Sequence, residues 1–154
     1  MQVKELSFDE FLGSQSMWES ALEKSLDNNV FETWEWLSAW WRHYRGTRRF
    51  FLVAAVEGEK LLAAAPLMFT NYRLLGLSIK RVEFLTNPAA DYHTFLLTEK
   101  KPELVKLILE HVKKEAEDWD LIELSDVPQD SETGKILLSA MLIDKKETKQ
   151  KIKY

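Results

Sequence analysis

Two apolar segments on either side of a short turn constrain the fold more than any other feature of the sequence. Residues 50–56 and 61–69 are apolar along almost their whole length, and the turn 57–60 between them contains a glycine. Two such runs joined by a short glycine-containing turn are typical of a β-hairpin. Pro66 lies inside the second run and has no N–H to donate, so it indicates an edge, a bulge or a break in the ladder. We therefore expect a sheet that contains this hairpin.

Hydrophobic periodicity, capping residues and turn residues predict the other elements. The predicted strands cover residues 3–8, 80–85, 92–97 and 121–124, with a turn or short strand at 74–76. The predicted helices cover residues 14–26, 34–44 and 102–118, and a last helix begins at residue 131. Thr33 and Pro102 suit the starts of two of these helices, and Gly46 suits the end of one.

This order of elements indicates the fold class. A sheet formed mainly by hairpins and flanked by helices is an α+β arrangement with a mixed, mostly antiparallel sheet. The helix at 102–118 should connect two strands that lie parallel in that sheet. The chain of 154 residues suits one domain of ordinary size. We expect residues 1–144 to form this single domain, and residues 145–154 to form a charged tail or a linking strand.

Composition and charge exclude several classes of function. The hydrophobic content of 45% and the charged content of 30% are ordinary for a folded globular protein. The absence of cysteine excludes disulfides and cysteine-ligated zinc, and the three histidines share no ligand spacing, so no metal is expected. A net charge of −4 argues against general nucleic-acid binding, and no apolar stretch approaches the ~20 residues of a membrane span. We therefore expect a cytoplasmic protein.

Three segments carry a resemblance to a known family. They are the aromatic segment 30–44 (VFETWEWLSAWWRHY), the segment 64–67 (AAPL) and the segment 91–96 (DYHTFL). Together with the order of elements, they resemble the CelD/FemAB-like acyltransferase family, whose members join two halves that each have the GNAT-like fold of N-acetyltransferases. The resemblance covers about residues 1–145 and only the first half of a family member. The aromatic segment is its most specific part.

The resemblance implies the acceptor-side half of a GNAT/FemAB-like N-acyltransferase, truncated at its C-terminal end and inactive alone. Enzymes of this family move an acyl or aminoacyl group to an amine or a hydroxyl, here on a small-molecule or sugar-linked acceptor. The acyl-CoA or acetyl-CoA donor would bind only in a complete two-half enzyme. The competing hypothesis is a non-catalytic binding or scaffold module, which could form a homodimer through an exposed strand edge.

The segment before the helix at 102–118 lacks the sequence of a diphosphate-binding turn. GNAT enzymes hold the pyrophosphate of acyl-CoA at this place with backbone N–H groups, where glycine permits a close approach. Residues 98–103 (TEKKPE) contain no glycine, and Pro102 lacks one of the N–H donors. Glu99 and Glu103 add negative charge where an anion would bind. We therefore expect no cofactor to be bound by this chain alone.

Asp91 and His93 are the candidate catalytic residues. A general base has to reach the amine that it deprotonates, and a histidine or a carboxylate with a shifted pKa can serve. Both residues flank the start of the strand predicted at 92–97, where a period of two places them on the same face. The resemblance puts this strand end near the acceptor, with Asp91 as the base. The alternative is a turn aspartate after Pro88 and a partly exposed histidine, neither of them catalytic.

The candidate substrate-binding residues come from the same segments. They are Trp36, Trp41, Arg42, Arg45 and Tyr92. The aromatic rings would form a wall of the acceptor pocket, and the arginines would meet an anionic acceptor. The alternative is that the tryptophans pack in the core on two sides of their helix, and that the arginines belong to a solvated helix end.

Overall fold

The computed structural model describes residues 1–115 and 119–143. Its strands are β1 (Gln2–Leu6), β2 (Arg49–Glu57), β3 (Lys60–Leu74), β4 (Leu77–Phe84), β5 (Leu96–Leu97) and β6 (Leu121–Glu123). Within the described residues they form one sheet with the order β1-β2-β3-β4-β6, and β5 also pairs with β3. The strand pairs are antiparallel, except that β4 and β6 are parallel. The predicted α+β class and the mostly antiparallel sheet are confirmed.

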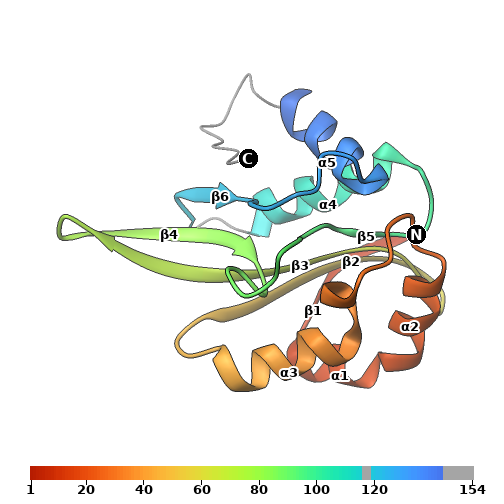
Figure 1. The fold of residues 1–154 in the computed structure, drawn as a ribbon, viewed down its shortest axis with the longest axis horizontal. Coiled ribbons are helices and arrows are strands. Elements are labelled where there is room, and N and C mark those ends of the chain that lie inside the picture. The colour runs from red at the N-terminus through yellow and green to blue at the C-terminus, as the bar shows by residue number, and fades with distance from the viewer. Residues whose placement is uncertain (116–118, 144–154) are drawn as a thin grey trace.

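Helices cover both faces of this sheet (Figure 1). They are α1 (Phe8–Gly13), α2 (Gln15–Glu23), the short 3-10 helix η1 (Val30–Glu32), α3 (Trp34–Tyr44), α4 (Pro102–Glu115) and α5 (Glu132–Ile143). Apolar side chains of α1, α2 and α3 pack on one face, and those of α4 and α5 pack on the other. Thr33 is the N-cap of α3 and Gly46, with φ of 52°, follows its end, as predicted. Residues 116–118, where the helix predicted at 102–118 was expected to end, and residues 145–154 lie outside the described residues.

The predicted hairpin of β2 and β3 forms the centre of the sheet. Its register places Val53 opposite Ala65. Phe51 and Val53 belong to the core beneath α4 and α5, whereas Leu52 and Ala54 belong to the core beneath α1, α2 and α3. Both faces of β2 are therefore buried, and this is why its sequence shows no polar alternation.

The strand predicted at residues 3–8 is shorter than expected, because a helix begins inside it. β1 ends at Leu6, and Ser7 caps α1. The Ser7 hydroxyl accepts a hydrogen bond from the Glu10 N–H at 3.2 Å, and the Glu10 carboxylate accepts one from the Ser7 N–H at 2.8 Å. A serine followed three residues later by a glutamate is the capping-box signature, which alternation alone does not detect.

The strand predicted at residues 92–97 is also too long. In the structure only Leu96–Leu97 pairs as β5, and β4 and β5 lie along the same side of β3. Between them, residues 85–95 leave the sheet as a loop. Pro66 lies opposite this interruption, where its carbonyl accepts a hydrogen bond from the Leu85 N–H at 3.0 Å. Pro66 therefore lies inside β3, and the break that it predicts falls in the neighbouring strand.

β3 and β4 continue beyond the helices as a two-stranded hairpin that projects from the body of the molecule (Figure 1). The turn predicted at 74–76 is its apex, where Leu75 and Gly76 have φ of 50° and 82°. β4 starts at Leu77, three residues before the predicted strand, because pairing with β3 extends to Leu74 opposite Leu77.

Candidate functional site

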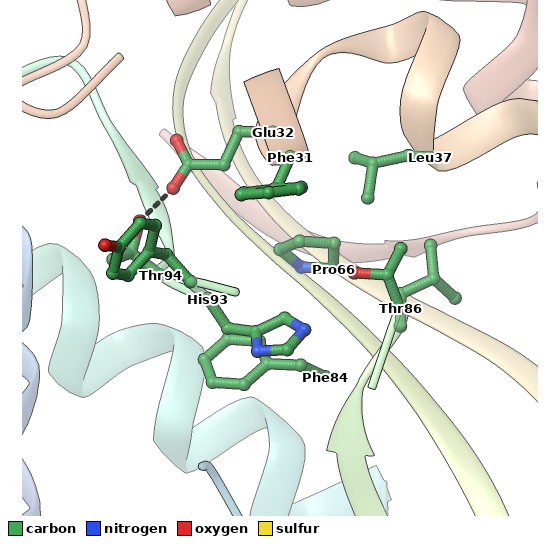
Figure 2. Close-up of a pocket in the computed structure, with 10 residues that line it drawn as sticks. Phe31, Glu32, Leu37, Pro66, Phe84, Thr86, His93 and Thr94 are labelled. Carbon is green, nitrogen blue, oxygen red and sulfur yellow. Dashed lines mark hydrogen bonds between the residues drawn. The ribbon is translucent and has the colours of Figure 1, made fainter. Parts of the chain in front are cut away.

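A small buried pocket lies where the sheet is interrupted between β4 and β5 (Figure 2). Its walls come from η1, α3, β3, the end of β4 and the loop at residues 85–95. The cavity has a volume of about 10 Å³, which is room for about one water molecule. Two ionisable side chains reach it from opposite walls, Glu32 from η1 and His93 from the loop.

Glu32 is a buried carboxyl group with an altered acidity. Its side chain is 3% exposed, and Oε1 accepts hydrogen bonds from Thr94 Oγ1 and, at 2.9 Å, from Asn29 Nδ2. Within the described residues, Oε2 has no hydrogen-bond partner. Burial raises the pKa of Glu32 from 4.5 to about 7, although the two hydrogen bonds partly oppose this rise. The group can therefore gain or lose a proton near neutral pH.

Local sequence holds Glu32 in place. The Asn29 side chain caps η1, because its Oδ1 accepts a hydrogen bond from the Phe31 N–H at 2.9 Å. The backbone carbonyl of Glu32 accepts a hydrogen bond from the Trp18 indole at 2.8 Å. Trp18 is itself fully buried beneath the sheet. The carboxyl group is therefore fixed from both its backbone and its side chain.

His93 forms the opposite wall of the pocket as a neutral ring. It is 4% exposed and stacks on Phe84, with ring centroids 5.0 Å apart and planes 10° apart. Its backbone N–H donates to the carbonyl of Asp126 at 3.1 Å. Neither ring nitrogen makes a hydrogen bond of good geometry within the described residues, although Asp126 and the backbones of Ser125 and Thr86 lie close enough to favour the protonated ring. Burial lowers the pKa of His93 from 6.5 to about 4, so the imidazole carries no charge at neutral pH.

One predicted substrate-binding residue, Tyr92, lines this pocket, and another, Trp36, lies against Phe31 beside it. The Phe31 ring lies between Trp36 and Tyr92, with centroid separations of 5.3 Å and 6.4 Å. Phe31 and Tyr92 both line the pocket, and more than half of Tyr92 is exposed. These rings therefore form an aromatic cover over Glu32 and His93 that is open to solvent at one side.

The other predicted site residues lie elsewhere. Asp91 is exposed on the 85–95 loop whereas His93 is buried, so the same-face placement expected from a strand is wrong. Trp41 is buried in the core against Phe50, with ring centroids 5.2 Å apart, which fits its alternative interpretation as a core residue. Arg42 and Arg45 are exposed at the end of α3, and neither lines the pocket. Catalysis by Asp91 remains a prediction.

Sequence reasoning did not identify Glu32. It belongs to the aromatic segment 30–44, in which the tryptophans and arginines were the predicted site residues. Two signals were available: an asparagine three residues earlier that suits a cap, and a carboxylate set among apolar neighbours, Val30, Phe31 and Trp34. Its partner Thr94 lies 62 residues away, and that pairing depends on the fold.

The turn before α4, where a diphosphate would bind, makes its own contacts within the protein. Its two lysines already pair with carboxylates, Lys101 with Glu99 and Lys100 with Glu132 of α5. Backbone bonds close the turn, because Lys101 N–H donates to the Glu99 carbonyl at 2.7 Å and Leu104 N–H donates to the Lys101 carbonyl at 3.1 Å. Both lysine side chains and two of the backbone N–H groups of this turn are therefore engaged within the protein.

Two other classes of site find no support in the described part of the chain. Its histidines and carboxylates form no group of three that could hold a metal ion. None of its helices combines the length and the apolar character that crossing a membrane requires.

Comparison with known proteins identifies the fold. No protein-family model and no curated protein matches this sequence. The structure is similar to the crystal structure of a ribosomal-protein-alanine N-acetyltransferase from Brucella melitensis biovar Abortus 2308, with a TM-score of 0.54. The superposition covers 92% of this chain and 91% of that chain, at 11% sequence identity. The chain therefore has the GNAT-like fold of an N-acetyltransferase.

Proposed function

We propose that this domain supplies the acceptor side of an N-acyltransferase, in which Glu32 takes the proton from the attacking amine. The observation that carries the proposal is the buried carboxyl group with a pKa of about 7 beneath an aromatic cover. An amine attacks an acyl group only when it is neutral, and a base whose pKa lies near the working pH removes its proton most effectively. The GNAT-like fold supports a reaction of this type.

The geometry defines how such an acceptor would bind. Glu32 is enclosed, so the amine would sit at the aromatic mouth formed by Phe31 and Tyr92. The cavity has room for about one water molecule, which is enough for a proton to pass through a single bridging molecule. His93 is neutral and would orient that bridge without competing for the proton. Asp91 is the rival base, as its sequence suggested.

The acyl donor would come from a second GNAT-like half, as in CelD/FemAB-like enzymes. The turn before α4 supports this part of the proposal, because both its lysines are paired with carboxylates and two of its N–H groups are hydrogen-bonded. We place the enzyme in the cytoplasm, with a small-molecule or sugar-linked acceptor. The neighbour's name adds a peptide with an N-terminal alanine as an acceptor worth testing.

Acyl transfer can be measured through the release of free CoA, detected with a thiol reagent. The chain has no cysteine and gives no thiol background. We expect no turnover of acetyl-CoA by this chain alone, and turnover with glucosamine or an alanine peptide once a CoA-binding half is added. Glu32→Gln should then lower kcat by about 100-fold or more, while Asp91→Asn changes it little. The reverse order of the two effects would make Asp91 the base.

The rival function is a non-catalytic binding or scaffold module with the same fold. The small volume of the buried cavity, about 10 Å³, favours it, because no acceptor group fits inside. Calorimetry separates the two functions. If the domain binds neither glucosamine nor an alanine peptide, and a CoA-binding half does not change this, the scaffold function stands and the acyltransferase proposal fails.

A further inference from the structure

An open cleft with a volume of about 500 Å³ lies at the base of the β3–β4 hairpin. It is lined by residues 46–48, which follow α3, and by residues 87–88 of the loop after β4. The two strands form its floor. The register pairs Thr70 with Arg81, and Glu83 follows two residues later on the same face of β4. A cleft of this size is within the range of small-molecule binding sites, about 300–1,000 Å³.

The floor of this cleft continues a face of the sheet that is otherwise apolar. Met68 precedes Thr70 by two residues and belongs to the core beneath α1, α2 and α3. The helix α3 ends at Tyr44, and residues 46–48, rather than a helix, border the floor. The face therefore changes from apolar to polar where the helices stop covering it and the cleft begins.

Arg81 is the centre of the floor. Its guanidinium group pairs with Glu83 and with Glu123 of β6, and it lies over the Tyr72 ring at 4.0 Å from the centroid. The side chains of Arg81 and Glu83 are only 12% and 4% exposed. Burying such a set costs desolvation free energy, and apolar residues of similar volume are often at least as stable. Stability alone therefore does not account for a charged floor at this place.

Two buried polar atoms of the floor have unused hydrogen-bonding capacity. Thr70 is 7% exposed. Neither Thr70 Oγ1 nor Arg81 Nε makes a hydrogen bond of good geometry within the described residues, although the Thr70 hydroxyl lies close enough to Glu83 to favour the charged carboxylate. Buried polar atoms without a partner are rare in folded proteins and call for an explanation outside packing. A ligand or a water molecule bound in the cleft supplies one.

The charges around the cleft balance within the described residues. Arg48 lines the cleft and Arg81 lies in its floor, and the two carboxylates of Glu83 and Glu123 oppose them. A phosphate bound here would meet the carboxylate of Glu83, and an ammonium group would meet the guanidinium of Arg81. The balance of charge therefore favours a neutral ligand.

The more exposed groups of the cleft are hydroxyl and amide groups. Thr47 and Tyr72 are exposed and Asn87 is half-buried. Hydroxyl and amide groups both donate and accept hydrogen bonds, which suits a ligand whose own groups do the same. The Asn87 Nδ2 donates to Glu83 Oε2 at 3.2 Å, and this bond fixes the direction of the amide.

We propose that this cleft binds a neutral, polyhydroxylated ligand, a single saccharide unit. Asn87 positions one hydroxyl group of the ligand, and Thr47 and Tyr72 contact others at the opening. The charged floor holds Asn87 in place through Glu83. The proposal rests on the cleft alone and does not depend on acyl transfer by Glu32.

An NMR titration of the whole chain tests the proposal. The probes are the methyl glycosides of glucose, galactose and mannose, and N-acetylglucosamine. We expect at least one of them to bind with a Kd in the millimolar range and to shift the backbone amide signals of residues 46–48, 70–72 and 81–88. Inorganic phosphate and methylammonium should shift these signals less, because each meets a like charge in the floor.

Two variants and a matched control connect the binding to the cleft. Asn87→Leu keeps the size of the side chain and removes its amide, so the affinity should fall about fivefold, the effect of one hydrogen bond. Thr47→Phe fills the cleft from an exposed position and should abolish binding. Asn28→Leu is the control, because the Asn28 amide also donates a hydrogen bond, to the Leu22 carbonyl at 3.3 Å, and Asn28 does not line the cleft. Its affinity should equal that of the wild type.

The proposal fails if none of the four sugars shifts the signals of the cleft. It also fails if either Asn87→Leu or Thr47→Phe, with the amide spectrum of a folded chain, binds the sugar like the wild type. Stronger shifts with phosphate than with every sugar would assign the cleft to an anion instead. Glu32→Gln should bind the sugar like the wild type, so the outcome is independent of the acyltransferase proposal.

Discussion

Polar side chains are usually exposed and apolar ones buried. The Glu32 pocket and the apex of the β3–β4 hairpin depart from this rule in opposite ways. In the pocket, a carboxyl group and an imidazole are 3% and 4% exposed, and each has an atom without a hydrogen-bond partner among the described residues. At the apex, Leu75 is 96% exposed. The same strand, β3, serves both regions, with Pro66 at the pocket and Leu74 near the apex.

The comparison separates the residues whose identity follows from burial in the folded protein from those whose identity does not. Between the two regions, β3 packs on both faces and its apolar residues follow from burial alone. A buried polar group without a partner costs free energy, and so does an exposed apolar group. Glu32 and His93 lie beside β3 and Leu75 follows its end, so the two departures flank one strand, and burial accounts for neither of them.

Replacing Glu32 should give the largest change in stability. If it does not, the buried carboxyl group is not a costly departure from the usual burial of apolar side chains. The pKa of Glu32 is 4.5 in an unfolded chain and about 7 in the folded protein, so folding favours the protonated form. Its contribution is full below pH 4.5 and is lost as the pH rises through 7, by about 3 kcal/mol. Glu32→Gln, which does not titrate, should therefore gain about 3 kcal/mol over the wild type between pH 4.5 and pH 8.

Urea denaturation at these two pH values measures the difference. The difference in the free energy of unfolding between the two proteins also includes the hydrogen bonds from Thr94 and Asn29, which glutamine keeps only in part. The change in that offset with pH is the informative quantity. An offset that is the same at pH 4.5 and pH 8 would show that Glu32 ionises in the folded protein as it does in the unfolded chain.

His93→Gln should give a pH dependence of nearly the same size and of opposite sign. Burial lowers the pKa of His93 to about 4, so folding favours the neutral ring. Its contribution is full above pH 6.5 and is lost as the pH falls through 4, by about 3 kcal/mol. In the wild type the two dependences oppose each other between pH 4.5 and 6.5. Stability of the wild type should therefore vary less with pH, over this window, than that of either variant.

Most of the fold could be predicted because its signals are local. The hairpin of β2 and β3 follows from two apolar runs and Gly58, and the start of α3 follows from Thr33. The errors have local and non-local causes. The helix α1 was missed because alternation was followed past the capping residue Ser7. The strand at 92–97 was overextended because the apolar residues of a buried loop resemble those of a strand.

The candidate site was predictable only in part, because its parts come from distant segments. Tyr92 and His93 were identified from one segment and line the pocket, whereas Trp36 was identified from another and lies against Phe31 beside it. Glu32 was missed, since the acidity of a carboxyl group depends on burial and on a threonine 62 residues away. The two local signals, Asn29 and the apolar neighbours, indicate a capped turn but do not give the acidity of the carboxyl group.

Leu75→Asn tests the apex of the β3–β4 hairpin, where the expected change in the free energy of unfolding is smaller. Asparagine adopts positive φ more readily than leucine, so the variant should be more stable than the wild type by about 0.5–1 kcal/mol at neutral pH. Leu75→Ala is the control, because alanine keeps the strain at φ of 50° while removing the apolar surface. Chemical denaturation measures both variants. An equal gain in Leu75→Ala would mean that the backbone of the apex is not strained by leucine.

Asp91→Asn should have the smallest effect and completes the comparison with Glu32→Gln. Both variants replace a carboxylate with its amide, but Asp91 is exposed on the loop whereas Glu32 is enclosed. A substitution at an exposed site changes the free energy of unfolding by about 0.5 kcal/mol at most. The same urea titrations measure it. A change in the free energy of unfolding as large as that of Glu32→Gln would show that the loop carries Asp91 into the pocket, and the contrast between an exposed aspartate and an enclosed glutamate would then fail.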